Sequence, residues 1–125
     1  MGTKKTILIV EDERSVIRIL HDKFTDEGFN VIEASNGEEG LKFALSKSPD
    51  LILLDIIMPR LDGISMLRKL REDPKGADIP VIILTNLSDE TQQLNLDDTH
   101  VLDYLIKTDW SLEDVVSKAK KHLGQ

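Results

Sequence analysis

Five short apolar runs recur along the chain, and polar residues follow each of them. The runs occupy Thr6–Val10, Asn30–Ala34, Leu51–Leu54, Val81–Leu84 and Leu102–Ile106. Most of these segments are almost continuously apolar, which is typical of strands that are buried on both faces. The pattern therefore predicts five strands of one parallel sheet.

Segments with helical spacing separate the apolar runs. Their apolar residues recur every three or four positions, as on the buried face of an amphipathic helix. The first three stripes lie within Val16–Phe24, Leu41–Leu45 and Ile64–Leu70. Gly28, Pro49 and Pro74 follow them as stop signals. We therefore expect a helix between each pair of successive strands.

The last two predicted helices differ in how clearly the sequence specifies them. Ser111 can cap the final helix, with Asp114 as a weaker capping-box partner and Trp110 and Val115 as a hydrophobic staple. The fourth helix, over Gln92–Thr99, is rich in residues whose side chains compete for backbone hydrogen bonds. We expect this fourth helix to be short, mobile or displaced.

Alternation of strands and helices predicts a doubly wound α/β fold with right-handed crossovers and helices on both faces of the sheet. With five strands and five helices, the leading topology is the flavodoxin-like strand order 2-1-3-4-5. In such sheets, ligands bind beyond the carboxyl ends of the strands, where the strand order reverses. We therefore expect the functional residues between the first and third strands.

Composition and charge narrow the class of protein. The chain has 125 residues, enough for one domain, and carries a net charge of -7. Such a charge argues against direct nucleic-acid binding, which needs a basic face. There is no cysteine, and no apolar run approaches the ~20 residues that cross a bilayer. We expect a cytoplasmic protein that is not bound to a membrane.

Three carboxylates, a threonine and a lysine follow the ends of the apolar runs. They are Glu11 and Asp12 after the first run, Asp55 after the third, Thr85 after the fourth and Lys107 after the fifth. Each residue alone has a common structural explanation, such as capping a helix. Their conjunction at the ends of successive strands predicts one shared site.

The residue types in this site suit metal-assisted phosphate chemistry. Clustered acids repel one another unless a divalent cation lies among them, and Mg²⁺ prefers oxygen ligands. A carboxylate can also act as a nucleophile towards phosphorus, and Asp55 is central in the predicted strand order. Thr85 and Lys107 would then hold two phosphoryl oxygens while the metal holds the third.

Several motifs together resemble a response-regulator receiver domain. They are the acidic pair after the first strand, the segment Asp-Leu-Ile-Leu-Leu-Asp-Ile-Ile-Met-Pro, and the pairs Asp62-Gly63 and Leu84-Thr85, with Tyr104-Leu105-Ile106-Lys107. The resemblance covers about residues 5 to 123, within a single domain of residues 1–125. No output domain follows Gln125, so we expect a stand-alone regulator or an excised receiver.

The resemblance implies a role for each site residue. Asp55 would accept a phosphoryl group from a sensor histidine kinase or a histidine phosphotransfer protein. Glu11, Asp12, Asp55 and the backbone carbonyl of Ile57 would hold Mg²⁺, for which Mn²⁺ could substitute. Thr85 and Lys107 would contact the phosphoryl group.

The resemblance further implies a conformational switch and a partner. Thr85 would move towards the phosphoryl group, and Tyr104 would follow it inward. The fifth strand with the fourth and fifth helices would present an output face to an unknown downstream protein. The chain would be a monomer or a phosphorylation-dependent dimer, and it would modify itself without turning over an external substrate.

The sequence departs from this family at two places. Thr108 follows Lys107 where the family usually has proline, so we expect a trans bond there. His100-Val101 replaces a small pair before the fifth strand, which favours an altered output face. A scaffold that binds a partner without accepting phosphate is therefore the alternative function. After its first strand the chain lacks both the phosphate loop that a flavoprotein on the same fold would need and the Asp-x-Asp motif that a phosphatase would need.

Overall fold

The computed structural model describes residues 4–55, 63–85, 101–106 and 111–124, with the backbone alone for residues 85 and 101–106. The strands in this part of the chain are β1 (Thr6–Val10), β2 (Asn30–Ala34), β3 (Leu51–Asp55), β4 (Val81–Thr85) and β5 (Val101–Ile106). Its helices are α1 (Arg14–Asp26), α2 (Gly37–Lys47), α3 (Gly63–Glu72) and α5 (Leu112–Leu123).

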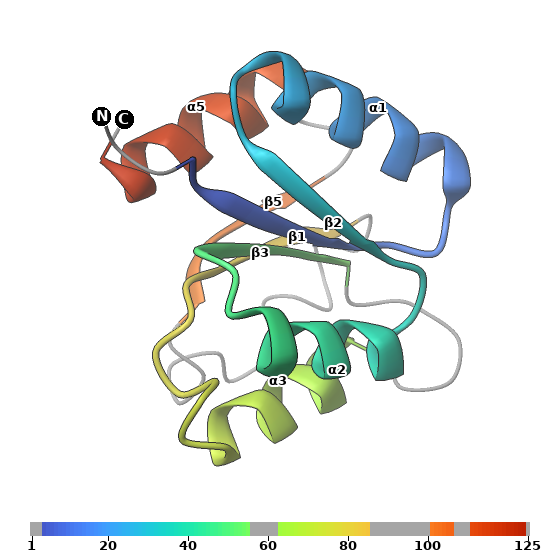
Figure 1. Cartoon of the computed structure of the whole chain (residues 1–125). Helices are drawn as coiled ribbons and strands as arrows, with labels where there is room; N and C mark the ends of the chain where they lie inside the picture. The colour runs from blue at the N-terminus through green and yellow to red at the C-terminus, as the bar shows by residue number, and fades with distance from the viewer. Residues whose placement is uncertain (1–3, 56–62, 86–100, 107–110, 125) are drawn as a thin grey trace.

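The five strands form one parallel sheet in the order β2-β1-β3-β4-β5 (Figure 1). This order confirms the predicted flavodoxin-like topology. The predicted strand bounds agree to within one residue, and the main difference is that β3 and β4 extend to Asp55 and Thr85. The predicted fourth helix, the bond between Lys107 and Thr108 and the staple residue Trp110 lie outside the described residues.

The sheet is covered on both faces. Figure 1 shows α1 and α5 side by side on one face and α2 and α3 on the other. Alternate residues of β1 enter opposite cores, because successive side chains of a strand point to opposite faces. Ile7 and Ile9 pack with α1 and α5, whereas Leu8 and Val10 pack with α2 and α3. All four side chains are fully buried, which explains why β1 is apolar without alternation.

The ends of the described helices follow the signals in the sequence. Helix α1 ends at Asp26, and Gly28 adopts the left-handed backbone conformation with φ of 94°. In α5, the Ser111 hydroxyl accepts a hydrogen bond from the Asp114 N–H at 3.2 Å. The Asp114 carboxylate accepts one from the Ser111 N–H at 2.8 Å. The predicted capping box is therefore confirmed.

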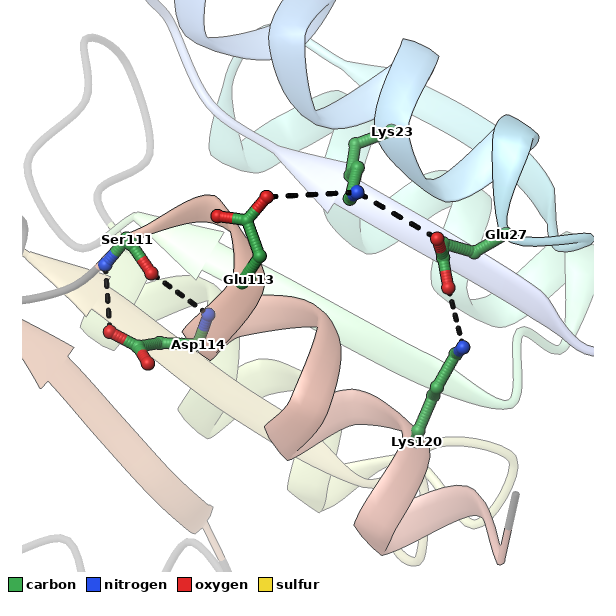
Figure 2. A network of polar contacts seen from close by, with 6 residues as sticks. All are labelled: Lys23, Glu27, Ser111, Glu113, Asp114 and Lys120. Atoms are coloured by element: carbon green, nitrogen blue, oxygen red, sulfur yellow. Dashed lines mark hydrogen bonds and ion pairs between the residues drawn. The ribbon is translucent and has the colours of Figure 1, made fainter.

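Helices α1 and α5 are joined by a chain of ion pairs (Figure 2). Lys23 Nζ lies 3.7 Å from Oε2 of Glu27, the residue that directly follows α1, and 3.8 Å from Glu113 Oε1 on α5. Lys120 of α5 donates a hydrogen bond to Glu27 Oε1. The hydrogen bond and the charge of Lys120 hold the pKa of Glu27 below its usual value. These contacts link segments that are far apart in the sequence.

The loop between α3 and β4 is held by an arginine from α3. Arg71 Nη1 donates hydrogen bonds to the carbonyls of Gly76 at 2.8 Å and Ala77 at 3.3 Å. Burial lowers the pKa of Arg71, and the negative charge of Asp78 opposes this effect. A Cβ atom on Gly76 would lie 2.5 Å from the Leu70 carbonyl oxygen. The close approach of this loop to α3 therefore requires glycine at position 76.

No helix in the described ranges combines the length and the apolar composition needed to cross a bilayer.

Candidate functional site

The adjacent strands β1 and β3 bring the predicted acidic residues together. Val10 of β1 lies opposite Leu54 of β3 in the parallel register. Glu11 and Asp12 follow Val10, and Asp55 follows Leu54 as the last residue of β3. All three acids therefore lie at the carboxyl edge of the sheet, where the strand order reverses between β1 and β3.

The three carboxylates form a cluster, in which each residue offers one oxygen and these oxygens lie within 4.8 Å of one another. Glu11 is 1% exposed and Asp55 is 6% exposed, whereas Asp12 is exposed. Such close carboxylates repel one another, and the repulsion is stronger where the surroundings exclude water. A divalent cation among them would remove this repulsion, and carboxylate oxygens are the ligands that Mg²⁺ prefers. The cluster can therefore hold a hard divalent cation.

Backbone hydrogen bonds fix the position of the acidic pair. The Glu11 N–H donates to the carbonyl of Ala34 at the end of β2, at 3.0 Å. The Glu13 N–H donates to Glu11 Oε1 at 3.2 Å, at the residue that precedes α1. Sequence reasoning did not identify these contacts, and no residue type signals them because the donors are main-chain groups. They orient the Glu11 carboxylate before any ligand binds.

The other predicted site residues lie partly outside the described residues. Thr85 ends β4, one residue after Leu84, which lies opposite Asp55 in the register of β3 and β4. Thr85 thus ends its strand at the same edge of the sheet as the acids. Tyr104 lies in β5 opposite Ile83. The predicted metal ligand Ile57 and the predicted phosphoryl contact Lys107 fall outside the described residues, so their roles stay predictions.

The N-terminus of α1 lies next to this cluster, since the helix begins two residues after Asp12. Ile19 is 55% exposed, the one large apolar side chain so exposed in the described ranges. It lines a shallow hollow beside β2 together with Arg18 and Asp22. His21 and Glu33 of β2 also line it, and the buried His21 Nδ1 lies 2.7 Å from Glu33 Oε2 without the alignment of a hydrogen bond. This face combines an apolar centre with a charged rim.

The comparisons with known proteins agree on one family. The chain matches the family model of the response regulator receiver domain over residues 7–120. The probable transcriptional regulator ycf27 of Porphyra purpurea is 40% identical over 104 residues, which are 83% of this chain and 42% of that protein. Response regulator PleD of Caulobacter vibrioides is 35% identical over 114 residues, 91% of this chain and 24% of PleD. The chain spans less than half the length of these relatives.

Solved structures show the same fold. Response regulator protein TrrA of Thermotoga maritima, in complex with Mg²⁺-BeF, is 32% identical with a TM-score of 0.82, and the match covers 94% of this chain and 98% of TrrA. Chemotaxis protein CheY4 of Vibrio cholerae has a TM-score of 0.85 at 23% identity, over 95% of this chain and 98% of that chain, which shows the fold alone. Together with the family match and the acidic cluster, these likenesses show that the chain belongs to the response regulator receiver domains of two-component signal transduction.

Proposed function

We propose that this receiver domain is the phosphoacceptor of a two-component system or phosphorelay, and that Asp55 is the residue that accepts the phosphoryl group. The observation that carries the proposal is the juxtaposition of Asp55 with Glu11 and Asp12. A carboxylate beside a second and third carboxylate is suited to hold a cation that also binds the incoming phosphate. The family match and the Mg²⁺-BeF complex of the relative TrrA support the same reading.

The proposed reaction forms an acyl phosphate. A carboxylate oxygen of Asp55 bonds to phosphorus, while the bond from phosphorus to the donor histidine nitrogen breaks and its electrons remain on that nitrogen. Mg²⁺, or Mn²⁺ in its place, would neutralise charge on the phosphoryl oxygens when bound. Glu11, whose carboxylate accepts a hydrogen bond from the Glu13 N–H, would help to hold the cation. Asp12, which is exposed, lies on the solvent side of the cluster.

The remaining roles are those that the family resemblance implies, and the strand register adds support only for Thr85 and Tyr104. Thr85, at the end of β4, would donate its hydroxyl to one phosphoryl oxygen, and Lys107 would place its ammonium group on another. The carbonyl of Ile57 would complete the metal ligands. Movement of Thr85 would be followed by Tyr104 in β5, which couples the site to an output face. These assignments rest on the family resemblance and on strand register.

The proposed phosphodonor is a sensor histidine kinase or a histidine phosphotransfer protein. We infer that the donor docks on α1, because this helix begins next to the acids and presents Ile19 with its charged neighbours. An apolar centre surrounded by a polar rim is the usual anatomy of a protein interface. The chain would act in the cytoplasm as a single domain with its core over about residues 5–123, as a monomer or a phosphorylation-dependent dimer.

Intact-mass measurement tests the proposal. The protein is incubated with acetyl phosphate and Mg²⁺, and one phosphoryl adduct is expected. The adduct should be absent in Asp55→Asn and in samples without divalent cation, but present in the control Asp22→Asn, an exposed acid on α1. No adduct in the unaltered protein would overturn the proposal and favour a scaffold that binds its partner without phosphorylation.

A further inference from the structure

The peptide bond between Asn36 and Gly37 lies where the chain passes from β2 into α2. The sequence has asparagine at four positions, and only Asn36 is followed by glycine. A glycine has no side chain to shield its backbone nitrogen from the preceding residue. We propose that Asn36 is a site of spontaneous deamidation and that the cap of α2 sets the rate of this reaction.

The reaction needs water alone as co-reactant. The Gly37 backbone nitrogen loses its proton to solvent base and bonds to the side-chain carbonyl carbon of Asn36. The bond from that carbon to the side-chain nitrogen breaks, and ammonia leaves. Water then opens the resulting five-membered imide at one of its two carbonyls, which yields aspartate or isoaspartate at position 36. No oxidation or reduction takes place.

The cap of α2 opposes this attack in the folded protein. Asn36 Oδ1 accepts a hydrogen bond from the Glu39 N–H at 2.9 Å, which holds the asparagine side chain in its capping conformation. Glu39 Oε1 in turn accepts hydrogen bonds from the Ser35 N–H at 2.8 Å and the Ser35 hydroxyl at 2.9 Å. Gly37 itself is buried in the first turn of the helix. The cyclisation therefore requires this turn to open.

Opening of the turn is a local event. All three hydrogen bonds of the cap are exposed to solvent, and Gly40, one turn further along α2, lies close to the Val10 side chain. Helix ends with exposed hydrogen bonds open at a far lower free-energy cost than the whole fold. Deamidation at Asn36 should therefore proceed in the native protein at a rate that reports the stability of the cap.

The products differ in their effect on the fold. Aspartate is as good an N-cap as asparagine, so α2 can keep its first turn. Isoaspartate adds one carbon to the main chain two residues after Ala34, whose carbonyl holds the Glu11 N–H. The modification thus changes the connection between the acidic edge of the sheet and α2.

Peptide mapping of protein aged at 37 °C and mildly alkaline pH tests the proposal, with the asparagines at positions 30, 86 and 95 as internal references. We expect conversion at Asn36 to exceed that at the three references. Glu39→Ala should raise the rate at Asn36 by about three- to tenfold, the range expected from loss of part of a helix cap. Ser35→Ala, which removes one of the hydrogen bonds, should have a smaller effect. Glu38→Ala is the matched control on the same helical turn.

Ageing of the chain unfolded in urea sets the upper limit for each rate. Equal rates in Glu39→Ala and Glu38→Ala, or a native rate equal to that in urea, would show that the cap does not control the reaction. A rate at Asn36 no higher than at the reference asparagines in urea would overturn the chemistry itself.

Discussion

Val10 of β1 lies opposite Leu54 of β3, and this register sets the geometry of the acidic cluster. Side chains at successive positions of a strand alternate between faces. A shift of β3 by one residue would therefore move Asp55 to the other face of the sheet, away from its present neighbours. The shift is opposed by the full burial of both Val10 and Leu54 in the core under α2 and α3. The fold thus uses core packing to align residues whose charges repel one another.

Asp12→Asn should have opposite effects on two quantities: it should lower the affinity of the cluster for Mg²⁺ and raise the stability of the metal-free protein. Loss of one carboxylate weakens binding of Mg²⁺ by about tenfold, roughly 1.4 kcal/mol. It also removes repulsion in the metal-free protein, whose free energy of unfolding should rise by up to about 1 kcal/mol. Calorimetric titration with Mg²⁺ and urea unfolding in a chelator measure the two effects. Asp22→Asn is the control, and a lower stability of metal-free Asp12→Asn would contradict the repulsion.

Ile19→Ser should impair docking of the phosphodonor and leave the acceptor chemistry intact. The side chain is 55% exposed, so its replacement costs little stability. We expect phosphoryl transfer from a histidine kinase that phosphorylates the unaltered chain to slow by about tenfold, which corresponds to loss of one apolar anchor. The rate with acetyl phosphate should stay the same. Equal slowing with both donors would show that Ile19 acts on the site and not on docking.

Glu27→Gln should destabilise the protein in a pH-dependent way. The pKa of Glu27 is lowered in the folded protein by Lys120, so its contribution to stability is present above the usual value of 4.5. The contribution is lost as the pH falls through the lowered value. The difference between variant and parent in urea unfolding should therefore be largest at neutral pH and shrink in acid. Glu113→Gln, which removes a carboxylate that is 74% exposed, should have a smaller effect.

Ser111→Ala should destabilise α5 by about 1 kcal/mol, the usual cost of losing a capping side chain. The hydroxyl of Ser111 accepts a hydrogen bond from the Asp114 N–H at 3.2 Å, which the Asp114 N–H shares with the Ser111 carbonyl oxygen at 3.1 Å. Urea unfolding followed by circular dichroism measures the change. Ser117→Ala is the matched control, because Ser117 is exposed within the same helix and alanine is the better helix former there. Equal effects of the two substitutions would contradict the role of the cap.

Gly76→Ala should be more costly, because the added methyl group meets the backbone of α3. Its Cβ would lie 2.4 Å from Leu70 Cδ1 and 2.5 Å from the Leu70 carbonyl oxygen. Relief requires the loop to move away from Arg71, at a cost of about 1–3 kcal/mol in the free energy of unfolding. Thermal unfolding measures the loss, with Lys75→Ala as the control at the exposed neighbouring residue. A melting temperature equal to that of the control would show that the loop adapts freely.

Local signals in the sequence were enough to predict much of this fold. The strand Ile7–Val10 is continuously apolar because both of its faces are covered, and this pattern is what predicts a strand buried on both sides. Ser111 and Asp114 form their capping box within a single turn, so the motif can be read from adjacent residues. The same reasoning placed Asp55 at the edge of the sheet beside the acidic pair. Each of these features depends either on residues that are adjacent in the sequence or on the strand order that the sequence pattern predicts.

Other features depend on contacts that no local pattern encodes. Glu11 is buried while the adjacent Asp12 is exposed, because one carboxylate turns towards the Glu13 N–H and the interior. The pairing of Glu27 with Lys120 spans 93 positions of the chain and depends on how α1 and α5 pack. The fourth helix was predicted from weak signals and stays a prediction.

The amino edge of the sheet lies a full strand away from the acidic cluster, about 17 Å for five residues. Lys5, which precedes β1, and Leu123, which ends α5, line one shallow hollow at this opposite pole. Figure 1 shows the start of β1 and the end of α5 close together there. A label or a second module attached near either residue therefore leaves the entrance to Asp55 unobstructed. For the same reason, a module attached at that pole does not contact Asp55 directly. A change at Asp55 can affect such a module only through movements of the strands and helices that lie between the two ends of the sheet.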